Sequence, residues 1–147
     1  MKIVLGFDDS PHAQMALHWI CRQHWPERTQ VIVVSAVRAP LAMYSDSYVP
    51  AVPYPTDVGE DLTRHHQELA SRAQRELRDA GLAAQTRVLQ GDPREWLVDV
   101  ARSDGADLVV LGSHGRTGLA KLLLGSVAAH VVSHAPCSVM VIKKPLG

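Results

Sequence analysis

The sequence is poor in cysteine and has none of the cysteine spacings that hold a metal. Cys21 and Cys137 are its two cysteines, and they lie far apart, without a CxxC pair or a Cys/His cluster. A disulfide framework and a zinc site of ordinary spacing are therefore excluded. We expect both thiols to be reduced and buried, which is typical of a cytoplasmic protein.

Long apolar runs and a surplus of one charge are also missing. No apolar run reaches the ~18 residues of a membrane-spanning helix, and Met1-Lys2 leads directly into an apolar strand-like run, so we expect neither a membrane anchor nor a signal peptide. Lys+Arg and Asp+Glu both number 15, which gives a formal net charge of zero. Because nucleic-acid binding depends on a surplus of basic residues, we expect no nucleic-acid partner.

What the chain does have is enough apolar residues for one core. It is 147 residues long and 46% hydrophobic, which is typical of a single folded domain over residues 1–147. Short β-branched runs alternate with helical patterns. They predict strands at 2–7, 30–37, 84–90, 106–111 and 137–142, and helices at 11–24, 58–80, 93–103 and 125–134. Ser10-Pro11 and Asp92-Pro93 are typical helix starts, in which a capping side chain precedes proline.

This order predicts an α/β fold with a doubly wound, five-stranded parallel sheet covered by helices on both faces. The strand at 84–90 alternates in polarity, which favours a place at an edge. Residues 38–57 are rich in proline and tyrosine and are interpreted as a long loop, either a lid, a partner surface or a disordered segment.

Two strand ends carry the residues of a ligand site. Ligands of such sheets bind beyond the carboxyl ends of the strands, where the strand order reverses. Gly112 and Gly115 follow the strand at 106–111, and Gly125-Ser126 opens the next helix. These glycines would let backbone amides approach a phosphate and adopt positive φ, with Arg116 or Lys121 as a cation. The alternative is that they only shape a turn.

Asp8-Asp9-Ser10 ends the first strand. Asp8 can accept from a ribose hydroxyl or hold a hydrated metal ion, or both acids can be turn and capping residues. The sequence contains no GxxxxGK[ST] and no GxGxxG after the first strand, so it is neither a Walker ATPase nor an ordinary NAD domain.

The spacing Gly112-x-x-Gly115, nine residues, Gly125-Ser126 resembles the G-2x-G-9x-G-[ST] signature of ATP-binding universal stress proteins, and "ADLVVLGSHG" and "APCSVMVIK" are similar to that family too. The resemblance implies a Rossmann-like fold, the adenine nucleotide alpha hydrolase-like one, with strand order 3-2-1-4-5. It implies ATP, with Mg²⁺ or Mn²⁺ as companion, and a dimer that pairs through residues 137–142. By position, the nucleotide contacts would be Gly6, Phe7, Asp8, Ala36, Leu111, Gly112, Ser113, His114, Gly115, Arg116, Gly125, Ser126 and Val127.

The family's function would make this chain a cytoplasmic, nucleotide-dependent switch or scaffold of the stress response, with an unknown protein partner and little or no turnover. Two alternatives stay open: a slow metal-dependent ATP hydrolase or adenylyl transferase, and a nucleotide-free interaction module. No Ser-His-Asp ordering and no convincing general base is evident, so we expect weak ATPase activity at most.

One departure from the family concerns Asp9, because many members have glycine there. Asp9 weakens ATP binding if it points at the phosphates and changes nothing if it points outward. Among the histidines, His130 and His134 have chelating spacing but no third ligand. His65 and His66 are interpreted as solvated, and His114 either contacts a ligand or caps the turn.

Overall fold

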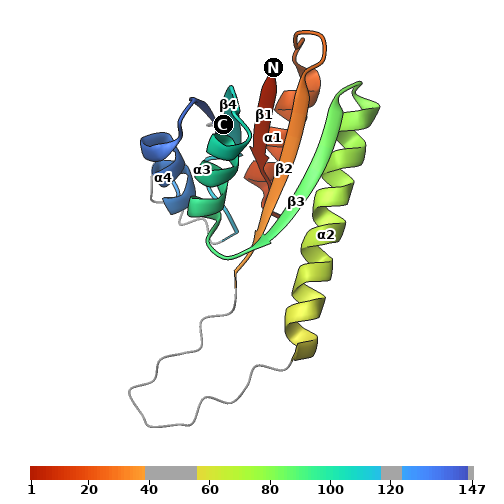
Figure 1. Cartoon of the computed structure of the whole chain (residues 1–147), viewed down its shortest axis with the longest axis vertical. Coiled ribbons are helices and arrows are strands. Elements are labelled where there is room, and N and C mark those ends of the chain that lie inside the picture. The colour runs from red at the N-terminus through yellow and green to blue at the C-terminus, as the bar shows by residue number, and fades with distance from the viewer. Residues whose placement is uncertain (39–55, 117–123, 146–147) are drawn as a thin grey trace.

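A computed structural model describes residues 1–38, 56–116 and 124–145. Five strands form one parallel sheet in the order β3-β2-β1-β4-β5, as predicted (Figure 1). They are β1 (Lys2–Gly6), β2 (Gln30–Val37), β3 (Ala83–Gln90), β4 (Leu108–Gly112) and β5 (Ser138–Ile142). Val4 of β1 lies opposite Ile32 of β2 and Val109 of β4, so β1 and β4 are the neighbours at which the strand order reverses.

Four helices among the described residues cover the two faces of this sheet. Pro11–Arg22 (α1) and Thr56–Asp79 (α2) pack on one face, and Pro93–Ser103 (α3) and Ser126–His134 (α4) pack on the other. Side chains that alternate along β1 therefore enter different cores: Ile3 and Leu5 join that of α1 and α2, and Val4 joins that of α3. The doubly wound arrangement is confirmed.

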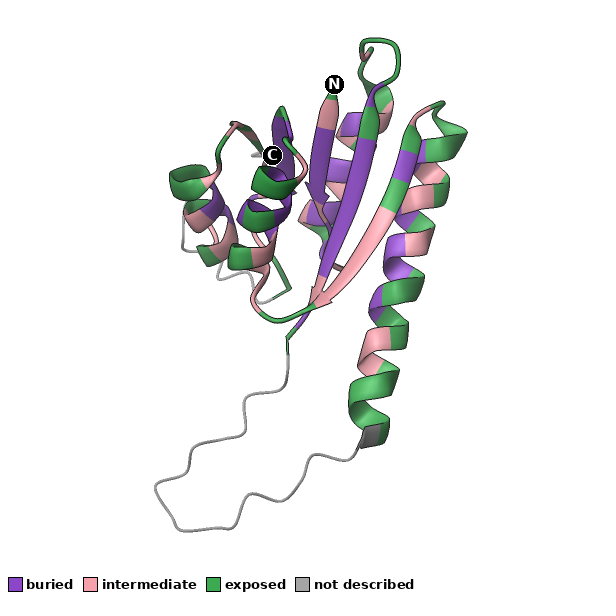
Figure 2. Ribbon diagram, in the orientation of Figure 1, coloured by how far each residue is buried: buried purple, intermediate pink, exposed green. Residues whose placement is uncertain are grey.

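Burial follows the strand order. The central strands are almost fully buried, whereas β3 and β5 at the two edges consist mostly of exposed and half-buried residues (Figure 2). The edge position predicted for 84–90 is thus confirmed. α2 is exposed along its outer side, and its N-terminal turns project past the carboxyl-end edge of the sheet, which is the lower edge in Figures 1 and 2.

The predicted helix starts are correct because each has its cap. Ser10 is extended and its Oγ accepts a hydrogen bond from the amide of Ala13 at 3.1 Å. Asp92 accepts from the amide of Arg94 at 2.9 Å. After the C-terminal end of α2, Gly81 has a φ of +86°, which suits its predicted role as a helix stop.

Some boundaries differ from the prediction. α2 begins at Thr56, so the last two residues of the predicted loop 38–57 are helical, and residues 39–55 lie outside the described residues. β4 begins at Leu108 rather than at 106, because the amide of Ala106 still bonds the carbonyl of Ala101 at the end of α3. Gly112 belongs to β4, where it pairs with Ile142 of β5.

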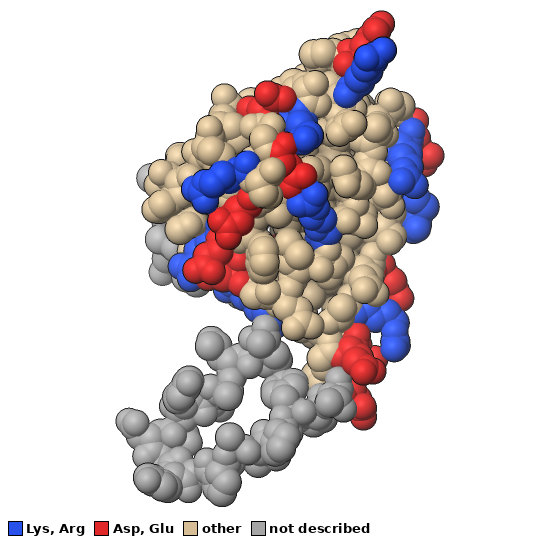
Figure 3. All heavy atoms as spheres, in the orientation of Figure 1, with Lys and Arg blue, Asp and Glu red and all other residues tan. Residues whose placement is uncertain are grey.

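The charged side chains are mixed on the face that Figure 3 shows, where Lys and Arg alternate with Asp and Glu. Within the described ranges, no helix combines the length and the apolar character that crossing a membrane requires. Both cysteines are free, but they are half-buried rather than buried. Burial raises the pKa of each thiol, with a further contribution from Glu76 at Cys21 and from Asp107 at Cys137, so both thiols stay protonated near neutral pH.

Candidate functional site

A cavity of about 700 Å³ lies at the carboxyl ends of β1, β2 and β4, where the strand order reverses. We call it the strand-end cavity. All thirteen residues predicted to contact a nucleotide line it: Gly6, Phe7, Asp8, Ala36, Leu111, Gly112, Ser113, His114, Gly115, Arg116, Gly125, Ser126 and Val127. The structure thus brings together residues that are far apart in sequence.

Nine further residues line the same cavity and were not predicted from the sequence: Ser10, Ala13, Val34, Arg38, Leu62, His66, Pro93, Leu97 and Ala128. Most are apolar and would have looked like ordinary core positions in the sequence. Arg38 follows β2 directly and its guanidinium lies 3.7 Å from the carboxylate of Asp92. Lys121, the other predicted cation, lies outside the described residues.

One wall of the cavity is apolar. Val34, Leu97, Leu111 and Ala128 belong to the core between the sheet and the helices α3 and α4, and Val127 packs against it. Such a wall can hold a flat apolar group such as a base, as is usual for ligand cavities.

Another part of the cavity is formed by the turn after β4 and by the start of α4. After β4, the amide of Ser113 bonds the carbonyl of Ile142 at 2.8 Å, and the amide of Gly125 bonds the carbonyl of Ser113 at 2.7 Å. These bonds fix the start of α4 beside the turn. Gly125 is the N-cap of α4, and no described side chain caps this end. The first amides of α4 are therefore available to an anion.

A side chain at each of the three glycines of this turn would meet a different neighbour. A Cβ at Gly112 would lie 2.6 Å from the carbonyl carbon of His12, so Gly112 lets α1 lie against β4. A Cβ at Gly115 would meet Asp8 Oδ2 at 3.2 Å, and one at Gly125 would meet the carbonyl oxygen of Ser113 at 3.1 Å. The expectation of positive φ is wrong for these three, because the positive-φ glycines of the described chain lie elsewhere.

Asp8 and Asp9 point in different directions. Asp8 lines the cavity, and its Oδ1 accepts from the amide of Ser10 at 2.9 Å, so it is also a capping residue. Asp9 is not among the described residues that line the cavity. Its Oδ1 lies 2.8 Å from Nε of Arg116, and its Oδ2 lies 3.7 Å from Nε2 of His65 on α2. Asp9 is thus directed toward Arg116 and His65 at the rim of the cavity, and its effect on nucleotide binding stays a prediction.

His66 corrects a prediction. It was interpreted as solvated, but it is 4% exposed and its Nδ1 lies 2.7 Å from Oγ of Ser35 on β2. Burial lowers the pKa of His66, and the neighbouring His65 and Arg116 lower it further. The sequence did contain a signal, because His66 continues the apolar stripe of Leu62 and Leu69 at helical spacing.

Within the described part of the chain, the remaining histidines belong to no metal-binding cluster. The rings of His130 and His134 stack with centroids 4.1 Å apart, but the described residues contain no group of three or more His, Cys, Asp or Glu side chains that could hold a metal ion. Nδ1 of His114 lies 3.0 Å from Oγ of Ser113 inside the turn, and its ring lies 5.4 Å from that of His12.

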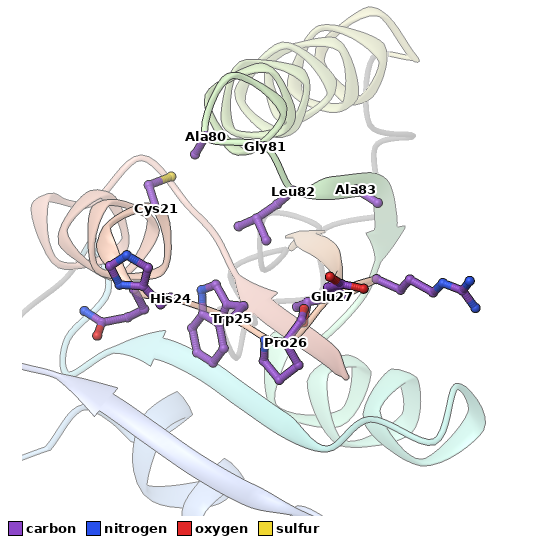
Figure 4. Close-up of a pocket in the computed structure, with 12 residues that line it drawn as sticks. Cys21, His24, Trp25, Pro26, Glu27, Ala80, Gly81, Leu82 and Ala83 are labelled. Carbon is purple, nitrogen blue, oxygen red and sulfur yellow. The ribbon is translucent and has the colours of Figure 1, made fainter.

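A second cavity, of about 400 Å³, lies near the amino-terminal ends of β2 and β3 (Figure 4). It is formed by the segment that joins α1 to β2, including Trp25, and by the turn around Gly81. The indole of Trp25 already donates to the carbonyl of Ile20 at 2.8 Å. Because ligands of open α/β sheets bind at the carboxyl ends of the strands, the strand-end cavity is the candidate functional site.

Comparison with known proteins gives one consistent result. Residues 1–143 match the universal stress protein family. Universal stress protein Sll1388 of Synechocystis is 30% identical over 149 residues, which span 97% of each chain. Universal stress protein MJ0531 of Methanocaldococcus jannaschii is 39% identical over 88 residues, which span 60% of this chain and 52% of that protein.

Solved structures agree with the sequence comparison. MJ0577 of M. jannaschii superposes with a TM-score of 0.85 at 25% identity, over 99% of this chain and 97% of that one. The universal stress protein of Archaeoglobus fulgidus in complex with dAMP has a TM-score of 0.65 at 24% identity, over 97% and 98% of the two chains. The fold is therefore the one that these structures share.

Proposed function

Because this chain belongs to the universal stress protein family, we propose that it binds ATP in the strand-end cavity and acts as a nucleotide-dependent switch or scaffold in the stress response. The observation that carries the proposal is the convergence of all thirteen predicted contact residues on one cavity at the reversal of strand order. The dAMP bound to the A. fulgidus protein supports an adenine nucleotide as the ligand class.

Each part of the cavity suits one part of the nucleotide. The apolar wall, which includes Leu111, takes the adenine together with Ala36, which also lines the cavity. Asp8 at the end of β1 accepts a hydrogen bond from a ribose hydroxyl. The amides around Gly115 and Ser126, together with the hydroxyl of Ser126, donate to the phosphates, because the uncapped start of α4 favours negative charge.

A divalent cation fits this site only as a companion of the nucleotide. The described residues supply no cluster of three metal-ligating side chains, and Asp8 is the carboxylate that lines the cavity. Asp8 would hold a hydrated Mg²⁺ or Mn²⁺ through water, while the phosphate oxygens supply other ligands. The ion would neutralise phosphate charge, which supports binding.

The sheet edge at β5 provides a surface for dimerisation. β5 alternates between exposed and half-buried residues, and Met140 is 38% exposed. An edge strand with apolar exposed residues favours pairing with another strand. We expect a homodimer through residues 137–142, with the nucleotide state read by a protein partner. Sedimentation of the wild type and of Met140→Lys, whose charge on the edge opposes pairing, tests this arrangement.

The primary test is the nucleotide content of freshly purified, denatured protein, measured by chromatography, followed by ATP titration of the emptied protein. Near-stoichiometric ATP supports the switch with little turnover. ADP in its place points to the slow hydrolase. A nucleotide-free protein that also fails to bind ATP contradicts the proposal.

A second candidate is a nucleotide-free interaction module of the same fold. It is favoured by the ion pair between Asp9 and Arg116, which neutralises a cation that lines the cavity. This candidate predicts a dimer that binds no adenine nucleotide, and the same titration separates the two.

A further inference from the structure

His66 is a buried polar group that faces the strand-end cavity from α2. Its residue exposure is 4%, and it lines the cavity beside Leu62 of the same helix. One ring nitrogen, Nδ1, is bonded to Ser35 Oγ at 2.7 Å, and no described residue gives Nε2 a hydrogen bond. Among the described residues, every side-chain nitrogen or oxygen that is fully buried has a hydrogen-bond partner, so an atom without a partner has access to open space. Nε2 therefore has access to open space, and His66 lines the strand-end cavity.

The bond to Ser35 fixes which nitrogen of His66 carries the proton. Ser35 is fully buried, and the ring of His66 is the partner recorded for its hydroxyl among the described residues. If Nδ1 donated the hydrogen, the hydroxyl proton of Ser35 would be buried without an acceptor, which is costly. The hydroxyl therefore donates to Nδ1, and the neutral ring carries its proton on Nε2.

The charges around His66 keep the ring neutral. On α2 its neighbour is His65. The β4–α4 turn contributes Arg116, and the β1–α1 turn contributes Asp8 and Asp9. Burial is the largest influence and lowers the pKa, His65 and Arg116 act in the same direction, and the two acids oppose them. A neutral donor is thus held inside the cavity.

The position of His66 points to the phosphates rather than the base. Ser35 belongs to the face of the sheet covered by α1 and α2, because it lies two residues beyond Val33 of that core. The apolar wall lies on the other face. The charged groups near His66, Asp8 and Arg116, flank Gly115 in the turn expected to hold phosphates.

We propose that Nε2–H of His66 donates a hydrogen bond to a phosphate oxygen of the bound nucleotide, so that His66 is a specificity residue that distinguishes phosphorylated ligands from adenosine. This inference rests on the proposed function, because it assigns a residue to the same cavity. It adds a side-chain donor from α2, which the glycine signature does not include.

The test compares binding of adenosine, AMP and ATP to emptied wild type, His66→Leu and His66→Gln by calorimetry. Leucine fills the site without a donor, whereas the glutamine amide restores a donor near Nε2. His24→Gln is the matched control, since His24 is exposed and lines the second cavity rather than the strand-end cavity. We expect His66→Leu to lose about tenfold or more in ATP affinity with adenosine unchanged, because a hydrogen bond to a charged group is lost. His66→Gln should recover part of this loss.

A loss that is equal for adenosine and ATP, or no loss, would overturn the inference while leaving the proposed function intact. Failure of the wild type to bind any adenine nucleotide would contradict both. If His66→Leu does not fold, nitrogen NMR of the wild-type ring decides: ATP should shift the Nε2 resonance of His66 and raise its pKa, and adenosine should not. An unchanged resonance with ATP bound overturns the inference.

Discussion

Nε of Arg116 lies 2.8 Å from Oδ1 of Asp9, and this ion pair joins the turn after β1 to the turn after β4 across the rim of the strand-end cavity. The side chains are 55% and 34% exposed, so solvent weakens their attraction. The pair therefore contributes little to folding. Its consequence is local: it directs Arg116 toward the rim and neutralises it there.

Replacing Asp9 by asparagine should strengthen ATP binding. The change releases Arg116 to the phosphates and removes a negative charge near them, so we expect about a two- to fivefold gain in ATP affinity, in keeping with an exposed pair. Adenosine affinity should not change. Calorimetry at low and moderate salt measures both. Asp79→Asn at the far end of α2 matches the change in net charge, and a similar gain in that variant would contradict a local effect.

Alanine substitutions at Gly112 and Gly115 should have different effects, the first on the free energy of unfolding and the second on ATP affinity. Alanine at Gly112 places Cβ 2.6 Å from the backbone carbon of His12, so α1 must shift and we expect a loss of about 1–3 kcal/mol in the free energy of unfolding. Among the described residues, alanine at Gly115 meets only the Asp8 carboxylate, at 3.2 Å, which can move.

We expect Gly115→Ala to keep its stability within about 0.5 kcal/mol and to lose ATP affinity, because its Cβ lies beside the expected ribose and phosphate groups. Urea denaturation and ATP titration of both variants measure the two effects. If Gly115→Ala is the less stable variant, the division between the two glycines is wrong.

The fold could be predicted from the sequence because short local patterns of residues indicate the individual strands and helices. β-branched runs predict the strands, and capped prolines at Pro11 and Pro93 predict two helix starts, so the β-α alternation leaves few topologies. The role of Gly112 in packing could not be predicted, since it depends on how closely α1 approaches β4. The direction of Asp9 depends on two other elements, and its partners Arg116 and His65 are far from it in sequence.

His66 was mispredicted for a different reason. The adjacent pair His65-His66 suggested two solvated residues, whereas helical spacing from Leu62 places His66 on the inner side of α2. Periodicity was the better guide than residue type, because a histidine can be buried where a hydroxyl such as that of Ser35 satisfies it.

Arg28→Gly should stabilise the protein. Arg28 has a φ of +62°, in a turn closed by a 3.2 Å bond from the amide of Thr29 to the carbonyl of Pro26. A side chain in this left-handed conformation costs about 1 kcal/mol that glycine avoids, so we expect a gain of up to about that size. Urea denaturation measures it. Glu27→Gly, one residue earlier and without positive φ, is the control, and an equal gain there would contradict the conformational cause.

The protein should lose stability in mild acid, in part through His66. Its folded-state pKa lies below the ordinary value of 6.5, because burial and then the neighbouring His65 and Arg116 disfavour the charged ring. Between the folded pKa and about 6.5, the unfolded chain binds more protons than the folded one, so the free energy of unfolding decreases as pH falls through this window. Above about pH 6.5, the ring of His66 is neutral in both the folded and the unfolded chain, so His66 adds nothing to the pH dependence of stability.

His66→Gln removes this titration, so urea denaturation at about pH 7.5 and pH 5.5 should show a smaller decrease for the variant than for the wild type. His24→Gln controls for the loss of a histidine, since His24 is exposed and is not among the groups that act on the pKa of His66. The comparison rests on the difference between the two pH values, so a uniform loss of stability in His66→Gln does not affect it. Equal decreases in wild type and His66→Gln would show that His66 does not resist protonation in the folded protein.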